Sequence, residues 1–97
     1  MDLSIIIVSY NSKEFIKKCL NSLLALKPNL AIEIIVIDNA SQDGSIDLIR
    51  KDFPEIKLIS NAGNIGYAKA CNQGIKKAEG RYFFILNPDT KLSGGSL

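Results

Sequence analysis

The side chains of this sequence that are best suited to chemistry stand where short apolar runs end. Each of four such runs is followed at once by polar residues, namely Ser9, Tyr10 and Asn11, then Asp38 and Asn39, then Asn61, and finally Asn87 and Asp89. Carboxylate oxygens suit Mg²⁺ or Mn²⁺, and amides and hydroxyls can orient a polar ligand. The sequence contains no histidine, which excludes an imidazole base or a histidine metal ligand within the chain.

Four apolar runs predict the strands that would position these side chains. They cover residues 3–10, 33–38, 56–60 and 82–86. Their residues are mainly branched or aromatic and lack polar alternation, which is typical of parallel strands buried on both faces. Pro88 ends the last run, because proline has no N–H for the ladder, and so places Asp89 just beyond a strand's carboxyl end.

Three segments with helical spacing separate the strands. The first is expected to begin at Asn11, which forms a capping-box pattern with Glu14, and to end by Pro28. The second is expected to begin at Asp43 or Ser45 and run to about residue 53, and the third covers 67–79, with Gly80 as its C-terminal cap.

The order βαβαβαβ predicts an α/β fold with three αβα layers and a mainly parallel, doubly wound sheet. The carboxyl ends of such strands share one edge, where ligands gather, so the polar residues should converge there. Asn11, Asp43 and Ser45 are explained equally well as caps and turn residues. Asp38 and Asp89 are not needed to begin a helix, which favours a functional role for both.

Composition limits the classes of function. With 97 residues, 46% hydrophobic content and a net charge of +2, the chain is one globular domain without a strong signal for nucleic acid or an anionic membrane. No apolar run approaches a membrane span, and Asp2 argues against a secretory signal, so a cytoplasmic location is expected. Cys19 and Cys71 lack metal-ligand spacing and are expected to be buried, reduced thiols.

Several nucleotide-binding signatures are missing. No Gly-x-Gly-x-x-Gly follows the first strand and no P-loop occurs, which disfavours a Rossmann dehydrogenase or a P-loop NTPase. A receiver domain would need an acidic pair after the first strand, and a sugar nucleotidyltransferase would need a glycine-rich basic loop there. Ser9, Tyr10 and Asn11 provide neither, which disfavours both classes. A diphosphate would have to bind in another way, and a divalent cation, Mg²⁺ or Mn²⁺, held by Asp89 would allow this.

Four segments together resemble the successive motifs of family 2 glycosyltransferases. They read SIIIVSYN at 4–11, IDNASQDGS at 37–45, NIGYAKACNQG at 64–74 and LNPDT at 86–90. The resemblance covers nearly the whole chain, and the four motifs occur in the family's order. The second and fourth segments, with Asp-Asn-Ala-Ser at 38–41 and Asn-Pro-Asp at 87–89, are most similar to the branch that contains rhamnosyltransferase-like enzymes of polysaccharide assembly.

The resemblance implies that the chain is the nucleotide-binding half of a GT-A fold with a UDP- or dTDP-sugar as donor. By similarity, Ser9, Tyr10 and Asn11 would line the base and ribose pocket, with Asp38 facing the base or ribose. Asn64 and Gly66 would shape the adjoining loop, and Asn87 and Asp89 would meet the diphosphate, with Asp89 holding the metal. The family's reaction is an inverting transfer to an acceptor hydroxyl.

Two departures from the family pattern qualify that expectation. The common Asp-x-Asp is Asn87-Pro88-Asp89 here, so one carboxylate is replaced by an amide. The family's catalytic base and acceptor site lie in a second half. Residues 1–97 are therefore expected to be a truncated nucleotide-sugar-binding domain with no catalytic residue of its own, inactive alone.

The complete enzyme would take a glycan or lipid-linked acceptor, at the inner membrane face if anchored there. The alternative is a short, non-catalytic module that binds a nucleotide or a partner. A reading frame that continues past Leu97 would favour the first hypothesis, and a stop codon there the second. In either case the edge formed by 81–97 is expected to self-associate.

Overall fold

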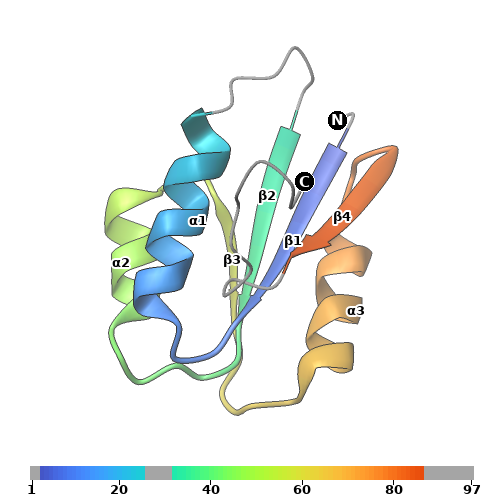
Figure 1. Ribbon diagram of the computed structural model, residues 1–97. Helices are drawn as coiled ribbons and strands as arrows, with labels where there is room; N and C mark the ends of the chain where they lie inside the picture. The colour runs from blue at the N-terminus through green and yellow to red at the C-terminus, as the bar shows by residue number, and fades with distance from the viewer. Residues whose placement is uncertain (1–2, 26–31, 87–97) are drawn as a thin grey trace.

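Four parallel strands form one sheet in the computed structural model, in the order β3-β2-β1-β4 (Figure 1). The strands are β1 (Leu3–Ser9), β2 (Ile32–Asp38), β3 (Lys57–Ser60) and β4 (Tyr82–Leu86). The helices between them are α1 (Lys13–Ala25), α2 (Ser45–Asp52) and α3 (Tyr67–Lys77). The structure describes residues 3–25 and 32–86.

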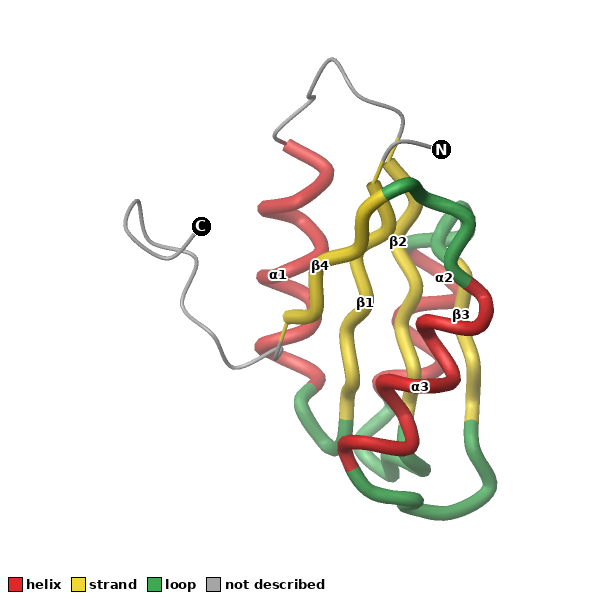
Figure 2. The backbone as a smooth tube through the Cα atoms, turned by 90° about the vertical axis from the view of Figure 1, so that its right-hand side faces the viewer, coloured by secondary structure: helices red, strands yellow, loops and turns green. Residues whose placement is uncertain are grey.

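Alternate side chains of β1 and β2 fill two separate cores, one on each face of the sheet. Ile5, Ile7, Ile34 and Val36 pack with α1 and α2, and Ile6, Val8, Ile35 and Ile37 pack with α3. Figure 2 shows α3 in front of the sheet, with α1 and α2 behind it. Because successive side chains point to opposite faces, a continuous apolar run is the pattern that a doubly covered strand needs. The predicted three-layer αβα fold is confirmed.

Helix α3 approaches the sheet closely through a glycine. A Cβ added to Gly74 would lie 2.5 Å from Cγ2 of Ile6 and 2.8 Å from Cδ1 of Ile37. A larger residue would therefore lift α3 away from β1 and β2.

The chain reverses direction across the sheet after β3. Strands β1, β2 and β3 are laid down in one direction, and α3 then crosses to the opposite side of β1, where β4 pairs with it. The loops that follow β1, β2 and β3 gather at the lower edge of the sheet in Figure 1. Ligands in doubly wound sheets bind at this edge.

The prediction that the last strand is buried on both faces is wrong. Tyr82 is 72% exposed, Phe83 52% and Phe84 45%, whereas Leu86 is buried. β4 pairs with β1 and forms an outer strand of the described sheet, and only its last two residues, Ile85 and Leu86, join the cores that the helices cover. Its aromatic character is typical of a strand that needs cover, but a sequence pattern does not say what supplies the cover.

Two predicted helix caps are also wrong. α1 begins at Lys13, and Asn11 adopts a left-handed φ of 47° and bonds to the next loop instead of capping the helix. α3 ends at Lys77 with Ala78 as its C-terminal cap, so Gly80 serves a different purpose. A Cβ on Gly80 would lie 2.6 Å from the Ser4 hydroxyl oxygen, so this glycine allows close approach to β1.

The remaining expectations concern thiols and membrane spans. Cys19 and Cys71 are both buried and free, as predicted, and burial raises the pKa of the Cys19 thiol. In residues 3–25 and 32–86, no helix combines the length and apolar character needed to cross a membrane.

Candidate functional site

Asp38 lies at the centre of the carboxyl edge of the sheet. It is the last residue of β2 and is fully buried. Both of its oxygens accept from Ser41, one from the backbone N–H at 2.8 Å and the other from the hydroxyl at 2.7 Å. Ser41 thus folds the loop back over the carboxylate and donates to both of its oxygens.

Asn11 joins the first loop to the second. Its N–H donates to the Ser41 hydroxyl at 2.8 Å, and its side-chain oxygen accepts from the N–H of Gln42 at 2.8 Å. Asn11 and Ala40 both adopt left-handed backbone conformations, with φ of 47° and 65°. Such conformations in residues other than glycine are strained and occur often at functional sites. The structure therefore brings together Asn11 and Asp38, two of the predicted site residues.

Ser9 and Tyr10 differ in accessibility. Ser9 is fully buried beside Asp38, its partner across the ladder, and its hydroxyl oxygen has no hydrogen-bond partner within the described residues. Its backbone carbonyl accepts from the N–H of Asn39 at 2.8 Å. Tyr10 is 50% exposed, so its ring is available to a ligand at this edge.

Asp43 is a turn residue just before α2, whose N-cap is Gly44 and not Asp43 or Ser45 as predicted. It accepts from the N–H of Lys13 at 3.0 Å, at the start of α1, and from the N–H and hydroxyl of Ser45, at the start of α2. Burial alone would raise the pKa of Asp43, but the hydrogen bonds from Ser45 and Lys13 outweigh it and lower that pKa. One carboxylate therefore holds the amino ends of two helices together.

The third loop carries Asn64 and Gly66. The Asn64 side-chain oxygen accepts from the N–H of Gly66 at 2.9 Å, and both residues are exposed. Gly66 has φ 87° and ψ 165°, a backbone region open essentially to glycine alone. Both residues follow β3 at the same edge as Asp38, as predicted.

Three side-chain amides connect the second and third loops; the sequence placed Asn39 and Asn61 at this edge without a defined role, and sequence reasoning missed Gln73. Asn61 donates to Asn39 at 2.9 Å and to Gln73 at 2.8 Å, and Gln73 donates back to Asn61 at 2.9 Å. Asn39 in turn donates to the carbonyl of Gly66 at 3.3 Å. The available signal was an asparagine directly after each of two neighbouring strands, Asn39 after β2 and Asn61 after β3.

The remaining predicted site residues, Asn87 and Asp89, lie outside the described residues. Within 3–25 and 32–86 there is no cluster of three or more His, Cys, Asp or Glu side chains that could hold a metal ion. Both oxygens of Asp38 accept hydrogen bonds from Ser41.

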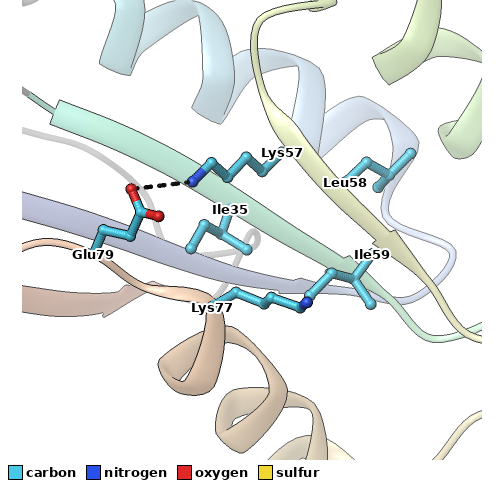
Figure 3. Close-up of a pocket in the computed structure, with 6 residues that line it drawn as sticks. All are labelled: Ile35, Lys57, Leu58, Ile59, Lys77 and Glu79. Atoms are coloured by element: carbon cyan, nitrogen blue, oxygen red, sulfur yellow. Dashed lines mark ion pairs between the residues drawn. The ribbon is translucent and has the colours of Figure 1, made fainter.

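A cavity of about 460 Å³ lies elsewhere, beside β3. Figure 3 shows the six residues that line it: Ile35, Lys57, Leu58, Ile59, Lys77 and Glu79. It exists because α3 packs against β1 and β2 and leaves the same face of β3 uncovered. None of the predicted site residues lines this cavity, so we do not assign the function to it.

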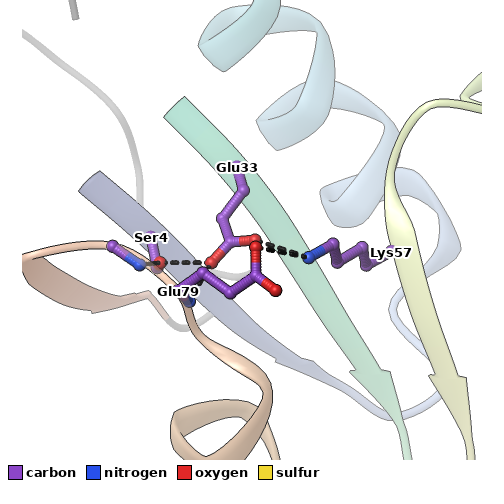
Figure 4. Close-up of polar contacts among 5 residues, drawn as sticks. Ser4, Glu33, Lys57 and Glu79 are labelled. Atoms are coloured by element: carbon purple, nitrogen blue, oxygen red, sulfur yellow. Dashed lines mark hydrogen bonds and ion pairs between the residues drawn. The ribbon is translucent and has the colours of Figure 1, made fainter. Parts of the chain in front are cut away.

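The opposite, amino-terminal edge of the sheet holds a second buried carboxylate, Glu33 (Figure 4). It accepts from the Ser4 hydroxyl at 2.5 Å, the N–H of Glu79 at 2.5 Å and the ammonium of Lys57 at 2.7 Å. The Ser4 hydroxyl also accepts from the N–H of Gly80 at 2.9 Å. Glu33 thus ties β1, β2 and β3 to the turn between α3 and β4.

The environment of Glu33 changes its acidity strongly. Burial alone would raise its pKa, but the bonds from Glu79, Lys57 and Ser4 lower the pKa to about 2. Sequence reasoning missed this cluster. The signal was a lone glutamate within an otherwise apolar strand, since a charge buried on a sheet face requires partners.

Comparison with known proteins adds a family to this geometry. Residues 4–97 match the family model described as glycosyl transferase family 2. The poly(ribitol-phosphate) beta-glucosyltransferase of Bacillus spizizenii is 33% identical over 102 residues, which is 100% of this chain and 16% of that protein. The chain therefore spans about a sixth of that relative's length.

Two solved structures are similar over nearly the whole chain. One is S. aureus TarS in complex with UDP-GlcNAc, with a TM-score of 0.79 and 29% identity over 92% of this chain and 27% of that one. The other is the mannosyltransferase PcManGT of Pyrobaculum calidifontis in complex with GDP-Man and Mn²⁺, with a TM-score of 0.80 and 26% identity over 90% of this chain and 27% of that one. Both likenesses agree with the predicted GT-A fold.

Proposed function

Because the chain belongs to glycosyl transferase family 2, we propose that it supplies the nucleotide-sugar-binding part of an inverting glycosyltransferase. The observation that carries the proposal is the meeting of three loops around the buried Asp38 at the carboxyl edge of a doubly wound sheet. Similar structures that hold UDP-GlcNAc and GDP-Man support it.

We assign the base and ribose to the first two loops. Each oxygen of the buried Asp38 keeps a lone pair beyond its bond to Ser41, and would use it to accept from N–H or O–H groups of the nucleoside. The exposed ring of Tyr10 would stack on or flank the base. Ser9 and Asn11 shape this pocket, and Asn64 and Gly66 form its adjoining wall. The donor we propose is a UDP- or dTDP-sugar.

We propose that Asp89, with the amide of Asn87 beside it, binds the donor's diphosphate through a divalent cation, Mg²⁺ or Mn²⁺. A metal bound there would neutralise the diphosphate as it leaves. The similar mannosyltransferase structure contains Mn²⁺, which supports this assignment. One carboxylate is sufficient for Mg²⁺ when phosphate oxygens and water provide the other ligands.

Transfer needs a carboxylate base that deprotonates the acceptor hydroxyl as it attacks the anomeric carbon. We assign no residue of this chain to that role. A glycan or lipid-linked acceptor would bind to a part of the enzyme outside residues 1–97, so we expect this chain alone to show no sugar transfer.

Calorimetric titration of UDP, dTDP and GDP, each with and without Mn²⁺, tests the proposal. We expect UDP or dTDP to bind, with Asp38→Asn weakening binding by about tenfold or more, as the loss of one charged hydrogen bond predicts. Asp89→Ala should remove the effect of Mn²⁺ and leave metal-free binding intact. Asp52→Ala, an exposed carboxylate on α2, is the matched control and should change neither.

Three results would contradict parts of this proposal. Absence of binding by all three nucleotides would overturn it. Unchanged Mn²⁺ dependence in Asp89→Ala would show that the metal is held elsewhere. Sugar turnover by the 97-residue chain would overturn the assignment of the base and acceptor site to another part of the enzyme.

The exposed aromatic residues of β4 support a further proposal, self-association of the isolated chain through the edge that begins at Arg81. Tyr82, Phe83 and Phe84 expose about half of their surfaces or more. Light scattering at rising concentration should show a species larger than the monomer, reduced by Phe83→Thr. A strictly monomeric chain at high concentration would contradict it.

A further inference from the structure

The side-chain amides of Asn39, Asn61 and Gln73 close a ring around the third loop. Asn61 uses both of its N–H groups, one toward Asn39 and one toward Gln73, and Gln73 returns a bond to Asn61. Asn39 continues the chain to the carbonyl of Gly66, which also accepts from the N–H of Ala70 in the first turn of α3. Because Gln73 lies on that same helix, the ring is complete.

This ring fixes both ends of the loop that contains Asn64. The loop begins at Asn61, which pairs with Gln73, and ends at Gly66, which is bonded to Asn39. Residues 62–66 are exposed and belong to neither apolar core. Hydrogen bonds therefore hold this loop in place where apolar packing does not.

Gln73 is suited to this task because its backbone is held rigidly. The next residue, Gly74, is the point where α3 comes closest to Ile6 and Ile37 of the sheet. Asn39 and Asn61 are fixed as well, since their N–H groups donate to the carbonyls of Ser9 and Asp38. The amide ring thus relates the loop directly to the sheet.

We propose that Gln73 is a positioning residue for nucleotide binding, acting through Asn61 and Asn39 to hold the Asn64–Gly66 turn in its binding conformation. This role rests on the proposed function. A loop already held in its bound conformation loses less conformational freedom when the ligand binds, so the ring should raise affinity without touching the nucleotide.

The test compares Gln73→Met, which keeps the length and removes the amide, with the unsubstituted chain and with Lys76→Met. Lys76 is exposed on the same helix, and its side chain forms no hydrogen bond or ion pair among the described residues. Affinity for UDP and dTDP is measured by calorimetry at a temperature where circular dichroism shows every variant folded. We expect Gln73→Met to weaken binding roughly tenfold.

A loss of overall stability must be separated from a loss of positioning. Ser4→Ala removes two hydrogen bonds at the opposite edge of the sheet and serves as the matched stability control. It should lower the melting temperature and leave nucleotide affinity unchanged. Amide hydrogen exchange without ligand should speed up for Asn61 and Gly66 in Gln73→Met and not in Ser4→Ala.

Weakened binding together with faster exchange only in Gln73→Met would support the proposal. If the unsubstituted chain binds nucleotide and Gln73→Met binds equally well, the positioning role is overturned and the proposed function stands. An equal loss of affinity in Ser4→Ala would also overturn it, because the effect would then follow stability. If the unsubstituted chain binds no nucleotide, the proposed function itself fails, and the positioning role with it.

Discussion

Strand β2 carries one carboxylate near each end, and the two differ in where their hydrogen-bond donors come from. Glu33, near the amino end, is buried and accepts from a hydroxyl, a backbone N–H and an ammonium group on three other segments. Asp38, at the carboxyl end, is also buried, but among the described residues its carboxylate accepts only from Ser41, three residues away. The first joins distant parts of the chain, and the second organises its own loop.

We therefore expect Glu33 to contribute mainly to stability and Asp38 mainly to ligand binding, although both lie on the same strand. The donors to Glu33 come from 24, 29 and 46 residues away in sequence, so they exist together only in the folded protein. Breaking that cluster should therefore cost stability. The bonds to Asp38 are local, and a substitution there should affect ligand binding more than folding.

The largest effect is expected from a matched pair of isosteric substitutions. Glu33→Gln should lower the free energy of unfolding by about 2 to 3 kcal/mol, because the ion pair is lost and an amide N–H is brought against a donor. Asp38→Asn should lower it by about 1 kcal/mol or less, because an amide can still pair with both groups of Ser41. Urea denaturation followed by circular dichroism measures both.

The same pair should have the opposite order in nucleotide binding, with Asp38→Asn impaired and Glu33→Gln unchanged. Equal stability losses in the two variants would remove the distinction between the two ends of β2.

Acid should remove the contribution of Glu33 selectively. Its pKa is about 2 in the folded protein, below the ordinary value of 4.5, so the ionised form favours folding. This contribution is complete above about pH 4.5 and is lost as pH falls from there through 2, amounting to about 3 kcal/mol. Denaturation curves of Glu33→Gln and the unsubstituted chain should therefore differ at pH 7 and converge near pH 2. A constant difference across this range would contradict a lowered pKa.

The order and layers of the fold could be predicted from sequence because they depend on local pattern. Consecutive branched residues at 5–8 and 34–37 can be buried only in a doubly covered strand, and the separating segments have helical spacing. The exposure of Phe83 and Phe84 could not be predicted, because cover depends on what packs against a strand. Asn11 was misjudged because its side chain bonds to Gln42, 31 residues away.

The site was predictable only where topology alone decides. Asp38 and Gly66 reach one edge because parallel strands end there, whatever their neighbours. The partnership of Asn61 with Gln73 depends on how α3 packs on the sheet, and that packing follows from Gly74. Glu33 was passed over because one charge in an apolar run does not identify its partners.

Two glycines allow a smaller version of the same comparison. A Cβ on Gly80, at the amino edge, would lie 2.7 Å from the backbone nitrogen of Ser4, so Gly80→Ala should cost about 2 kcal/mol of stability through a backbone clash. A Cβ on Gly66, at the carboxyl edge, meets nothing within 4 Å, but its φ of 87° is strained for alanine, at about 1 kcal/mol or more. Only Gly66→Ala should also weaken nucleotide binding, which calorimetry can measure. If Gly80→Ala also weakened nucleotide binding under conditions in which it is fully folded, the assignment of binding to the carboxyl edge would be contradicted.

Small effects are expected for Lys57→Met, which removes a charge from the amino edge and leaves Glu33 in place. The Lys57 side chain is 47% exposed, and its hydrogen bond to Glu33 raises the pKa of the ammonium group. Water can replace an exposed ammonium, whereas it cannot easily replace the hydroxyl of Ser4 or the N–H of Glu79. Lys57→Met should therefore lower the free energy of unfolding less than Glu33→Gln does. Lys77 lines the cavity beside β3 together with Lys57 but forms no ion pair among the described residues, so Lys77→Met should lower it least. A loss in Lys57→Met as large as in Glu33→Gln would mean that the ion pair with Lys57, and not the hydrogen bonds from Ser4 and Glu79, holds the amino end of β2.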